Sequence, residues 1–194
     1  MRLPLDAVVC GLGASLRGWT APPGAVVFGV NDVGKYLLPD HLVVVDRRLR
    51  FAPERLHVIE STKAKVGWLA SPDGWSLATH ETKHFAITDA HPHRPLDIDG
   101  EQLPQYMTST FAATVIACRL GHLRIGLIGV DLVGHALAKY AASISTMFGR
   151  LAHLIEKRGG ALVNLSSVSL LTSLPRVSSD APFMEPACSS VKPS

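Results

Sequence analysis

Several features are scarce in this chain, and each scarcity removes a class of protein. No long apolar stretch follows Met1, because glycines soon interrupt the first apolar run, so neither a signal peptide nor a membrane span is expected. The net charge is only +3 and no run of five or six basic residues occurs, so a nucleic-acid surface is not indicated. The three cysteines have no metal-type spacing. We therefore expect a cytoplasmic protein with no membrane contact.

Two familiar nucleotide-binding motifs are also missing. The dinucleotide fingerprint Gly-x-Gly-x-x-Gly begins at Gly11 and Gly13, but Leu16 occupies the position of the third glycine. Asn31 stands where that fingerprint expects an acid. No glycine precedes a Lys-Ser or Lys-Thr pair in Walker spacing. NAD-type redox chemistry and classical kinase or GTPase chemistry are therefore disfavoured.

The composition is that of a globular protein with a well-buried core. Hydrophobic residues make up 47% of the 194 residues and charged residues only 18%. This length suits one domain, and so apolar a composition favours a layered α/β fold. We predict a single three-layer, Rossmann-like α/β domain with a mainly parallel sheet over residues 1–177, and a flexible tail over residues 178–194.

Apolar runs and helical spacing locate the main elements. Buried strands are predicted over residues 7–11, 25–30, 41–46, 124–130 and 161–165. A Ser/Thr cap at 108–110 precedes an apolar, buried helix over 111–120, and apolar spacings of three and four predict an amphipathic helix over 138–157. Residues 47 to about 105 are expected to form short strands, among them 66–70 and 84–88, and long loops. His91 and His93 are expected to lie in such a loop rather than to bind a metal.

Polar groups follow several predicted strands at their carboxyl ends, where open parallel sheets bind ligands. The Gly11 to Gly13 turn comes after the first strand, and Asn31 and Asp46 follow the second and third. The turn would direct its N–H groups toward a phosphate, with Ser15 capping the next helix. A tight turn without a ligand is the alternative for this loop. Asp46 either caps its own turn or contacts the ligand.

The order of six short motifs resembles one known superfamily. These motifs are Gly11 to Leu16, Val30-Asn31, Val44-Val45-Asp46, Thr108-Ser109-Thr110 with its Ala-rich helix, Gly129-Val130-Asp131, and Asn164 to Leu171. Together they resemble the bacterial sialyltransferase-like glycosyltransferases and hydroxymethylpterin-diphosphokinase-like proteins, which include small phage and prophage members. The likeness covers most of residues 5 to 175.

The resemblance implies a glycosyltransferase-like transferase that binds a nucleotide or nucleotide-sugar donor and an acceptor of unknown identity, without a required cofactor. The donor site it implies comprises Gly11, Gly13, Ser15, Asn31, Asp46, Thr108 and Ser109, with Ser167 and Ser169 at the nucleoside. Gly134-His135 matches the Gly-His pair that supplies the general base in sialyltransferases. His135 is therefore the expected catalytic base, and Asp131 is the second residue assigned to the catalytic site.

Departures from the superfamily pattern leave alternatives open. Leu12 and Ala14 replace the usual Asn and Pro, and the short spacing from Asp131 to His135 leaves no room for the acceptor lid of sialyltransferases. One alternative is Mg²⁺-dependent diphosphate transfer to a small hydroxymethyl compound, with Asp46 or Asp131 at the metal. Another is a catalytically degenerate nucleotide-binding or virion-associated protein. Asp131 would position a ribose, a metal or a loop. The alternative for His135 is a histidine at a helix start or on the surface, and homo-oligomerisation is open.

Overall fold

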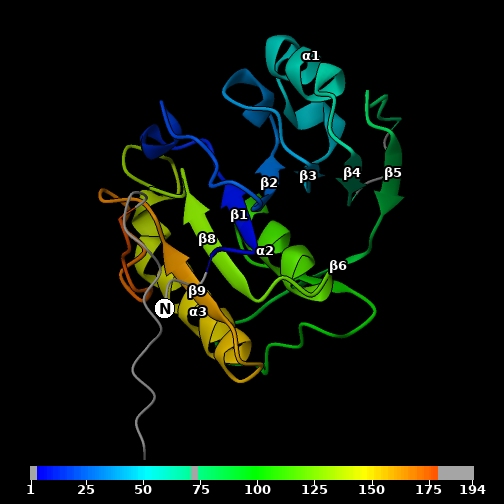
Figure 1. Ribbon diagram of the computed structural model, residues 1–194. Helices are drawn as coiled ribbons and strands as arrows, with labels where there is room; N and C mark the ends of the chain where they lie inside the picture. The colour runs from blue at the N-terminus through cyan, green and yellow to red at the C-terminus, as the bar shows by residue number, and fades with distance from the viewer. Residues whose placement is uncertain (1–3, 71–73, 179–194) are drawn as a thin grey trace, which may run out of the picture.

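A seven-stranded, all-parallel sheet forms the centre of the protein (Figure 1). The computed structural model describes residues 4–70 and 74–178, so nearly all of the expected tail lies outside the described residues. The strand order is β5-β4-β3-β2-β1-β8-β9. These strands are β1 (Ala7–Cys10), β2 (Val26–Val30), β3 (His41–Val44), β4 (Val66–Leu69), β5 (Glu81–His84), β8 (Arg124–Ile128) and β9 (Ala161–Asn164). The predicted Rossmann-like α/β fold is confirmed.

Within the described residues, the remaining elements are three α-helices, four short 3₁₀ helices and a second pair of parallel strands. The α-helices are α1 (Pro53–Ser61), α2 (Ser109–Arg119) and α3 (Ala141–Glu156). The 3₁₀ helices are η1 (Ala14–Leu16), η2 (Val33–Lys35), η3 (Arg48–Arg50) and η4 (Ala138–Tyr140), and the second pair comprises β6 (Ile87–Asp89) and β7 (Leu103–Gln105). Among the described residues, no helix is long and apolar enough to cross a membrane.

Side chains of β1 alternate between two apolar layers, one on each face of the sheet. Val9 belongs to the core beneath α2 and α3, whereas Val8 belongs to the core that includes Ile59 of α1. Residues Ser109 to Cys118 of α2 are all buried, which confirms the predicted central helix. The predicted cap is confirmed too, because the Thr108 hydroxyl accepts the Phe111 N–H at 3.2 Å.

The middle third of the chain differs from its prediction in two places. Helix α1 stands where short strands and loops were expected. Its signal is weak, because Ile59 is its only buried residue and no apolar face repeats along it. The predicted strand over 84–88 is wrong, because β5 ends at His84 and β6 begins at Ile87.

The connection from β6 to β7 is a long loop that contains His91 and His93, as expected. Two arginines from the adjacent helices fix it. Arg119 of α2 donates to the carbonyl oxygens of Ile98, Gly100 and Gln102, and Arg150 of α3 donates to those of His91, Pro92 and Arg94. These bonds go to the main chain of the loop, and its own side chains add the Asp99–Arg158 ion pair and the buried Ile98.

His41, at the start of β3, makes the stability of the fold sensitive to pH. Its ring stacks on Phe28 with the centroids 4.4 Å apart, and its Nδ1 accepts the Trp68 indole N–H at 3.0 Å. Burial lowers the pKa of His41, with smaller contributions from His122 and nearby lysines, and the Asp40 carboxylate opposes this shift only in part. A proton on Nδ1 would remove the acceptor that Trp68 uses.

We expect stability to decrease as pH falls below about 6.5, the ordinary histidine pKa. Between that value and the lower pKa of folded His41, the unfolded chain binds more protons, so acid favours unfolding. Urea unfolding at pH 7.5 and pH 5.5 measures the effect. In His41→Gln, the free energy of unfolding should differ less between the two pH values than it does in the wild type. His57→Gln, at an exposed position of α1, should keep the wild-type difference. Equal pH dependence in the wild type and His41→Gln would contradict this assignment.

Candidate functional site

A cleft of about 530 Å³ opens at the carboxyl edge of the sheet, where the strand order reverses. Strand β1 pairs with β2 on one side and with β8 on the other, which makes this edge the switch point where open α/β sheets bind ligands. The structure brings most of the predicted site residues into the lining of this cleft: Gly11, Gly13, Asn31, Asp46, Thr108, Ser109, Asp131 and His135. Their roles stay predictions, but their convergence is a property of the fold.

The glycine amides of the first loop bond to β8 and the residue after it, not to open space. Gly11 donates its N–H to the carbonyl oxygen of Ile128 at 2.8 Å, and Gly13 donates to that of Gly129 at 2.7 Å. To contact a phosphate as expected, these two N–H groups would first have to break their bonds to the carbonyl oxygens. Among the described residues, the N–H groups of Leu12 and Ala14 have no acceptor, and both residues line the cleft. The loop therefore offers a ligand the amides next to the predicted ones.

Ser15 fastens the loop instead of capping a helix. Its N–H donates to Asp131 Oδ2 at 2.8 Å and its hydroxyl donates to Asp131 Oδ1 at 2.6 Å. The same hydroxyl accepts the Gly129 N–H at 3.0 Å. The next element is only the three-residue η1, with Gly13 at its N-cap position. The predicted cap is wrong, and Ser15 does not line the cleft.

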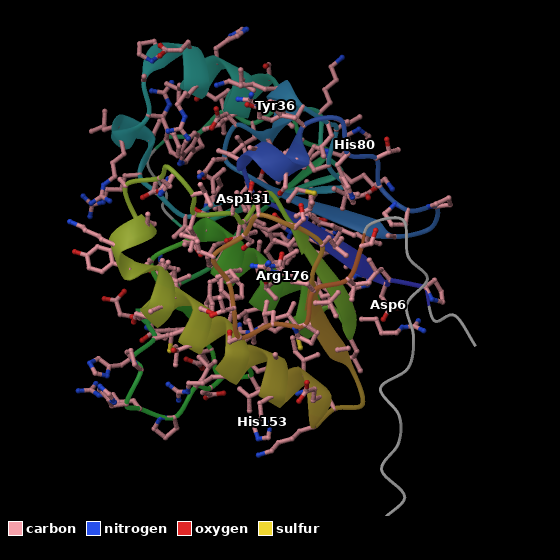
Figure 2. The ribbon with its side chains drawn as sticks, turned by 90° about the vertical axis from the view of Figure 1, so that its left-hand side faces the viewer. Asp6, Tyr36, His80, Asp131, His153 and Arg176 are labelled. Carbon is pink, nitrogen blue, oxygen red and sulfur yellow. The ribbon has the colours of Figure 1, made fainter. Side chains whose placement is uncertain are left out.

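Asp131 connects three segments at the floor of the cleft. Besides the two bonds from Ser15, its Oδ1 accepts the Ser166 hydroxyl at 2.6 Å. Asp131 is only 3% exposed, and in Figure 2 it lies at the same end of the sheet as the blue loop after β1. Asp131 was expected to position a ribose, a metal or a loop, and these contacts fit the third role. Ser166 belongs to the polar turn predicted at this edge, but its bond to Asp131, 35 residues away in the chain, is not encoded by any local pattern.

Ser167 and Ser169, the predicted nucleoside ligands, do not reach the cleft. The Ser169 hydroxyl is buried, donates to the carbonyl oxygen of Val130 at 2.7 Å and accepts the Leu171 N–H at 3.1 Å. Ser167 is exposed, and its carbonyl oxygen accepts a bond from Arg176. In this structure these serines shape the turn after β9.

Backbone strain is concentrated at the cleft. Asn31, Met107 and Leu132 have φ values of 51°, 57° and 61°, and they are the only non-glycine residues with positive φ among those the structure describes. All three line the cleft. This conformation costs Met107 and Leu132 about 1–2 kcal/mol each and Asn31 less, because asparagine adopts it more readily, and such strain is common at functional sites. The Asn31 Oδ1 is also buried and has no hydrogen-bond partner within the described ranges.

The N-terminus of α2 points its first turn at the cleft. Thr108, Ser109 and Thr110 all line it. The Thr108 hydroxyl is engaged as the helix cap, and it also accepts the Thr110 hydroxyl at 3.0 Å. The first N–H groups of an α-helix have no acceptor within the helix and carry a partial positive charge. This end of the cleft is therefore suited to an anion.

His135 is exposed, and one of its ring nitrogens is already engaged. Its Nδ1 accepts the Leu137 N–H at 3.1 Å. A neutral imidazole with this bond carries its proton on Nε2, so the free nitrogen is a donor. Action as a base through Nε2 requires the opposite tautomer and the loss of the Leu137 bond.

Two arginines that the site prediction did not include line the other wall. Arg50 contacts Asp46, with Nη1 3.4 Å from Oδ1, and the Asp46 side chain is 40% exposed. Arg55 donates twice to the buried Asp32. Burial tends to raise the pKa of the Asp32 carboxyl, but bonds from Arg55 and Lys35 outweigh it and lower the pKa. Arg55 gave no signal because α1 itself was not predicted.

Within residues 4–70 and 74–178, no group of three or more His, Cys, Asp or Glu side chains is placed to hold a metal ion.

Comparisons with known proteins find no relative of this chain. The likeness to the sialyltransferase-like superfamily stays a prediction from the motifs. The chain matches no protein-family model, and neither the curated proteins nor the solved structures contain a match to it.

Proposed function

We propose that the cleft binds a nucleotide or nucleotide-sugar donor and that the protein is a glycosyltransferase-like transferase. The observation that carries the proposal is the convergence of unpaired main-chain donors and strained residues at the switch point of the sheet. The first turn of α2 faces the same cleft as the N–H groups of Leu12 and Ala14. Several main-chain N–H groups directed at one space are a common way to bind phosphate.

Asn31 supplies the complementary contact to the uncharged part of the donor. Its Oδ1 has no partner in the described structure, and a buried acceptor left in that state costs about 1–3 kcal/mol. Because this oxygen is buried, the Asn31 side chain would rotate to accept a bond from a ligand hydroxyl or N–H, such as that of a ribose or a base, and this bond would remove the cost. The positive φ of Asn31 holds the side chain at the end of β2, where such a group would lie.

His135 is the proposed proton acceptor. In the transfer, the bond from the donor's anomeric carbon to the phosphate oxygen breaks and a bond to the acceptor oxygen forms. The acceptor's hydroxyl proton passes to Nε2 of His135, and the nucleotide leaves as an anion near α2. The ring must first take the tautomer protonated on Nδ1, which releases the Leu137 N–H. Rearrangement of residues 132–137 is therefore part of the proposed cycle.

A panel of nucleotides and sugar nucleotides tests the binding. A ligand that binds only the folded state must raise the thermal midpoint, and titration calorimetry then gives its dissociation constant. Asn31→Ala is expected to weaken the ligand so found about tenfold, the effect of one lost hydrogen bond to a buried group. Gln102→Ala, which removes an exposed amide from the loop before β7, is the matched control. A panel without any response would contradict the proposal.

His135→Ala separates binding from transfer. The variant should bind the donor as the wild type does and should lose turnover at saturating donor and acceptor. Unchanged turnover would refute the role of His135. A wild type that binds nucleotides but transfers no group with any acceptor tested would identify the catalytically degenerate binding protein instead.

Asp46 favours the Mg²⁺-dependent alternative. Its side chain lines the cleft and is 40% exposed, whereas both Asp131 oxygens already accept bonds from serines. Mg²⁺ is commonly held by one or two carboxylates together with substrate phosphates. Donor binding that requires Mg²⁺ and is abolished by a chelator would support diphosphate transfer over glycosyl transfer.

A further inference from the structure

Arg55 is held in a fixed orientation by a buried carboxylate. Its Nε and Nη2 donate to Asp32 Oδ1 at 3.0 and 2.6 Å. Asp32 is only 4% exposed, and its other oxygen contacts Lys35 Nζ at 2.5 Å. Two cations thus share one carboxylate, and the group keeps one positive charge. A surface arginine normally samples many rotamers, but this one is already ordered, so less entropy is lost when it binds an anion.

The free edge of the Arg55 guanidinium is available at the cleft. Its central carbon lies 5.1 Å from the centroid of the Phe51 ring, and both residues line the cleft. Nη1 has no partner among the described residues, and the side chain is 38% exposed. The bonds to Asp32 and the contact with Phe51 thus leave the N–H groups of Nη1 for a ligand.

Arg55 and the first turn of α2 reach the cleft from opposite faces of the sheet. Phe111 in the first turn of α2 belongs to one core layer, whereas Phe51 and Ile59, on either side of Arg55, belong to the other. The carboxyl end of β2 lies between them, since α2 packs on β2 and Asp32 stands two residues after the end of that strand. The cleft thus has two positive ends.

We infer that Arg55 forms a second anion site and that the ligand of the cleft carries a diphosphate, with one phosphate at the first turn of α2 and the other at Arg55. The inference rests on the proposed function for the first phosphate and narrows the donor to diphosphate-linked compounds. A guanidinium matches phosphate because its N–H groups bind two oxygens in one plane. Asp32 acts as the positioning residue.

Titration calorimetry with inorganic phosphate and with pyrophosphate, both without metal, tests this inference. The wild type is expected to bind pyrophosphate at least about tenfold more tightly than phosphate. Arg55→Met keeps an unbranched stem over Phe51 but removes the charge, and it should abolish this preference. Arg47→Met is the matched control, because Arg47 is an exposed arginine of the preceding segment that does not line the cleft. It should keep most of the preference.

Arg55→Lys guards against a folding defect in the methionine variant. Lysine keeps the charge but has no second edge to bind phosphate while it contacts Asp32, so an intermediate preference is expected. Urea unfolding verifies that each variant is folded. A wild type that does not prefer pyrophosphate, or an unchanged preference in Arg55→Met and Arg55→Lys, would overturn the inference.

The proposed function and this inference fail in different ways. If pyrophosphate binds in an Arg55-dependent manner and no nucleotide or sugar nucleotide binds, the anion site stands and the proposed function falls. A different result is that nucleotides bind, but the wild type does not prefer diphosphates over monophosphates and Arg55→Met binds both as the wild type does. The proposed function then stands and the second anion site falls.

Discussion

Asp131→Ala is expected to lower the free energy of unfolding by about 3–5 kcal/mol, because it leaves three donors without their charged acceptor. These donors are the N–H and hydroxyl of Ser15 and the hydroxyl of Ser166. Water has little access to the position, since Asp131 is 3% and Ser166 is 2% exposed. The loss should appear as a lower urea midpoint with an unchanged denaturant slope.

Two further variants serve as an intermediate and as a control for Asp131→Ala. Asp131→Asn keeps the shape of the side chain and one acceptor oxygen, so its loss should lie between those of the wild type and Asp131→Ala. Asp89→Ala removes an exposed carboxylate from β6 and should change stability by less than about 0.5 kcal/mol. A loss below about 1 kcal/mol for Asp131→Ala would show that these bonds contribute little to the fold.

Gly11→Ala should cost about 3 kcal/mol, because the added methyl group meets main-chain atoms that have little freedom to move. An ideal Cβ on Gly11 would lie 2.3 Å from the carbonyl oxygen of Gly129 and 2.9 Å from its carbonyl carbon. The approach is mutual, since a Cβ on Gly129 would lie 2.6 Å from the Gly11 oxygen. Relief requires β1 and β8 to separate at the floor of the cleft, which is a severe form of overpacking.

Gly24→Ala is the control for Gly11→Ala. Gly24 has a φ of 82° and no atom within 4 Å of its Cβ position, so alanine there bears only the cost of a left-handed backbone, about 1–2 kcal/mol. Urea unfolding of both variants distinguishes the cost of the steric contact at Gly11 from the cost of the backbone conformation at Gly24. Equal losses would contradict the close approach of the two glycines.

The sequence was sufficient to locate most strands of the sheet and the edge where the cleft opens. Strand β1 and helix α2 are dense apolar segments, and their burial gives each of them a clear local pattern. The location of the site follows from topology. Parallel strands have their carboxyl ends at one edge of the sheet, so Asn31 and Asp46, which follow two of these strands, meet at that edge. Fold and site location therefore depend on short-range patterns combined with one general rule.

The direction of individual donors was beyond such patterns. Whether the Gly13 N–H and the Ser15 hydroxyl face a ligand or the protein depends on Gly129 and Asp131, more than a hundred residues along the chain. Sequence spacing carries no information about contacts at that separation. The amphipathic signal of α1 was too weak for the same method, and Arg55 was missed along with it.

The bonds of Asp131 also set when the cleft is completed during synthesis. Ser15, Asp131 and Ser166 come from the beginning, the second half and nearly the end of the described chain. A nascent chain that has released β8 but not Ser166 has a carboxylate without its third donor and a loop fixed from one side only. Contacts of such long range form late, since loop closure must precede them. A ligand would thus find its binding cleft complete only after β9 has joined the sheet.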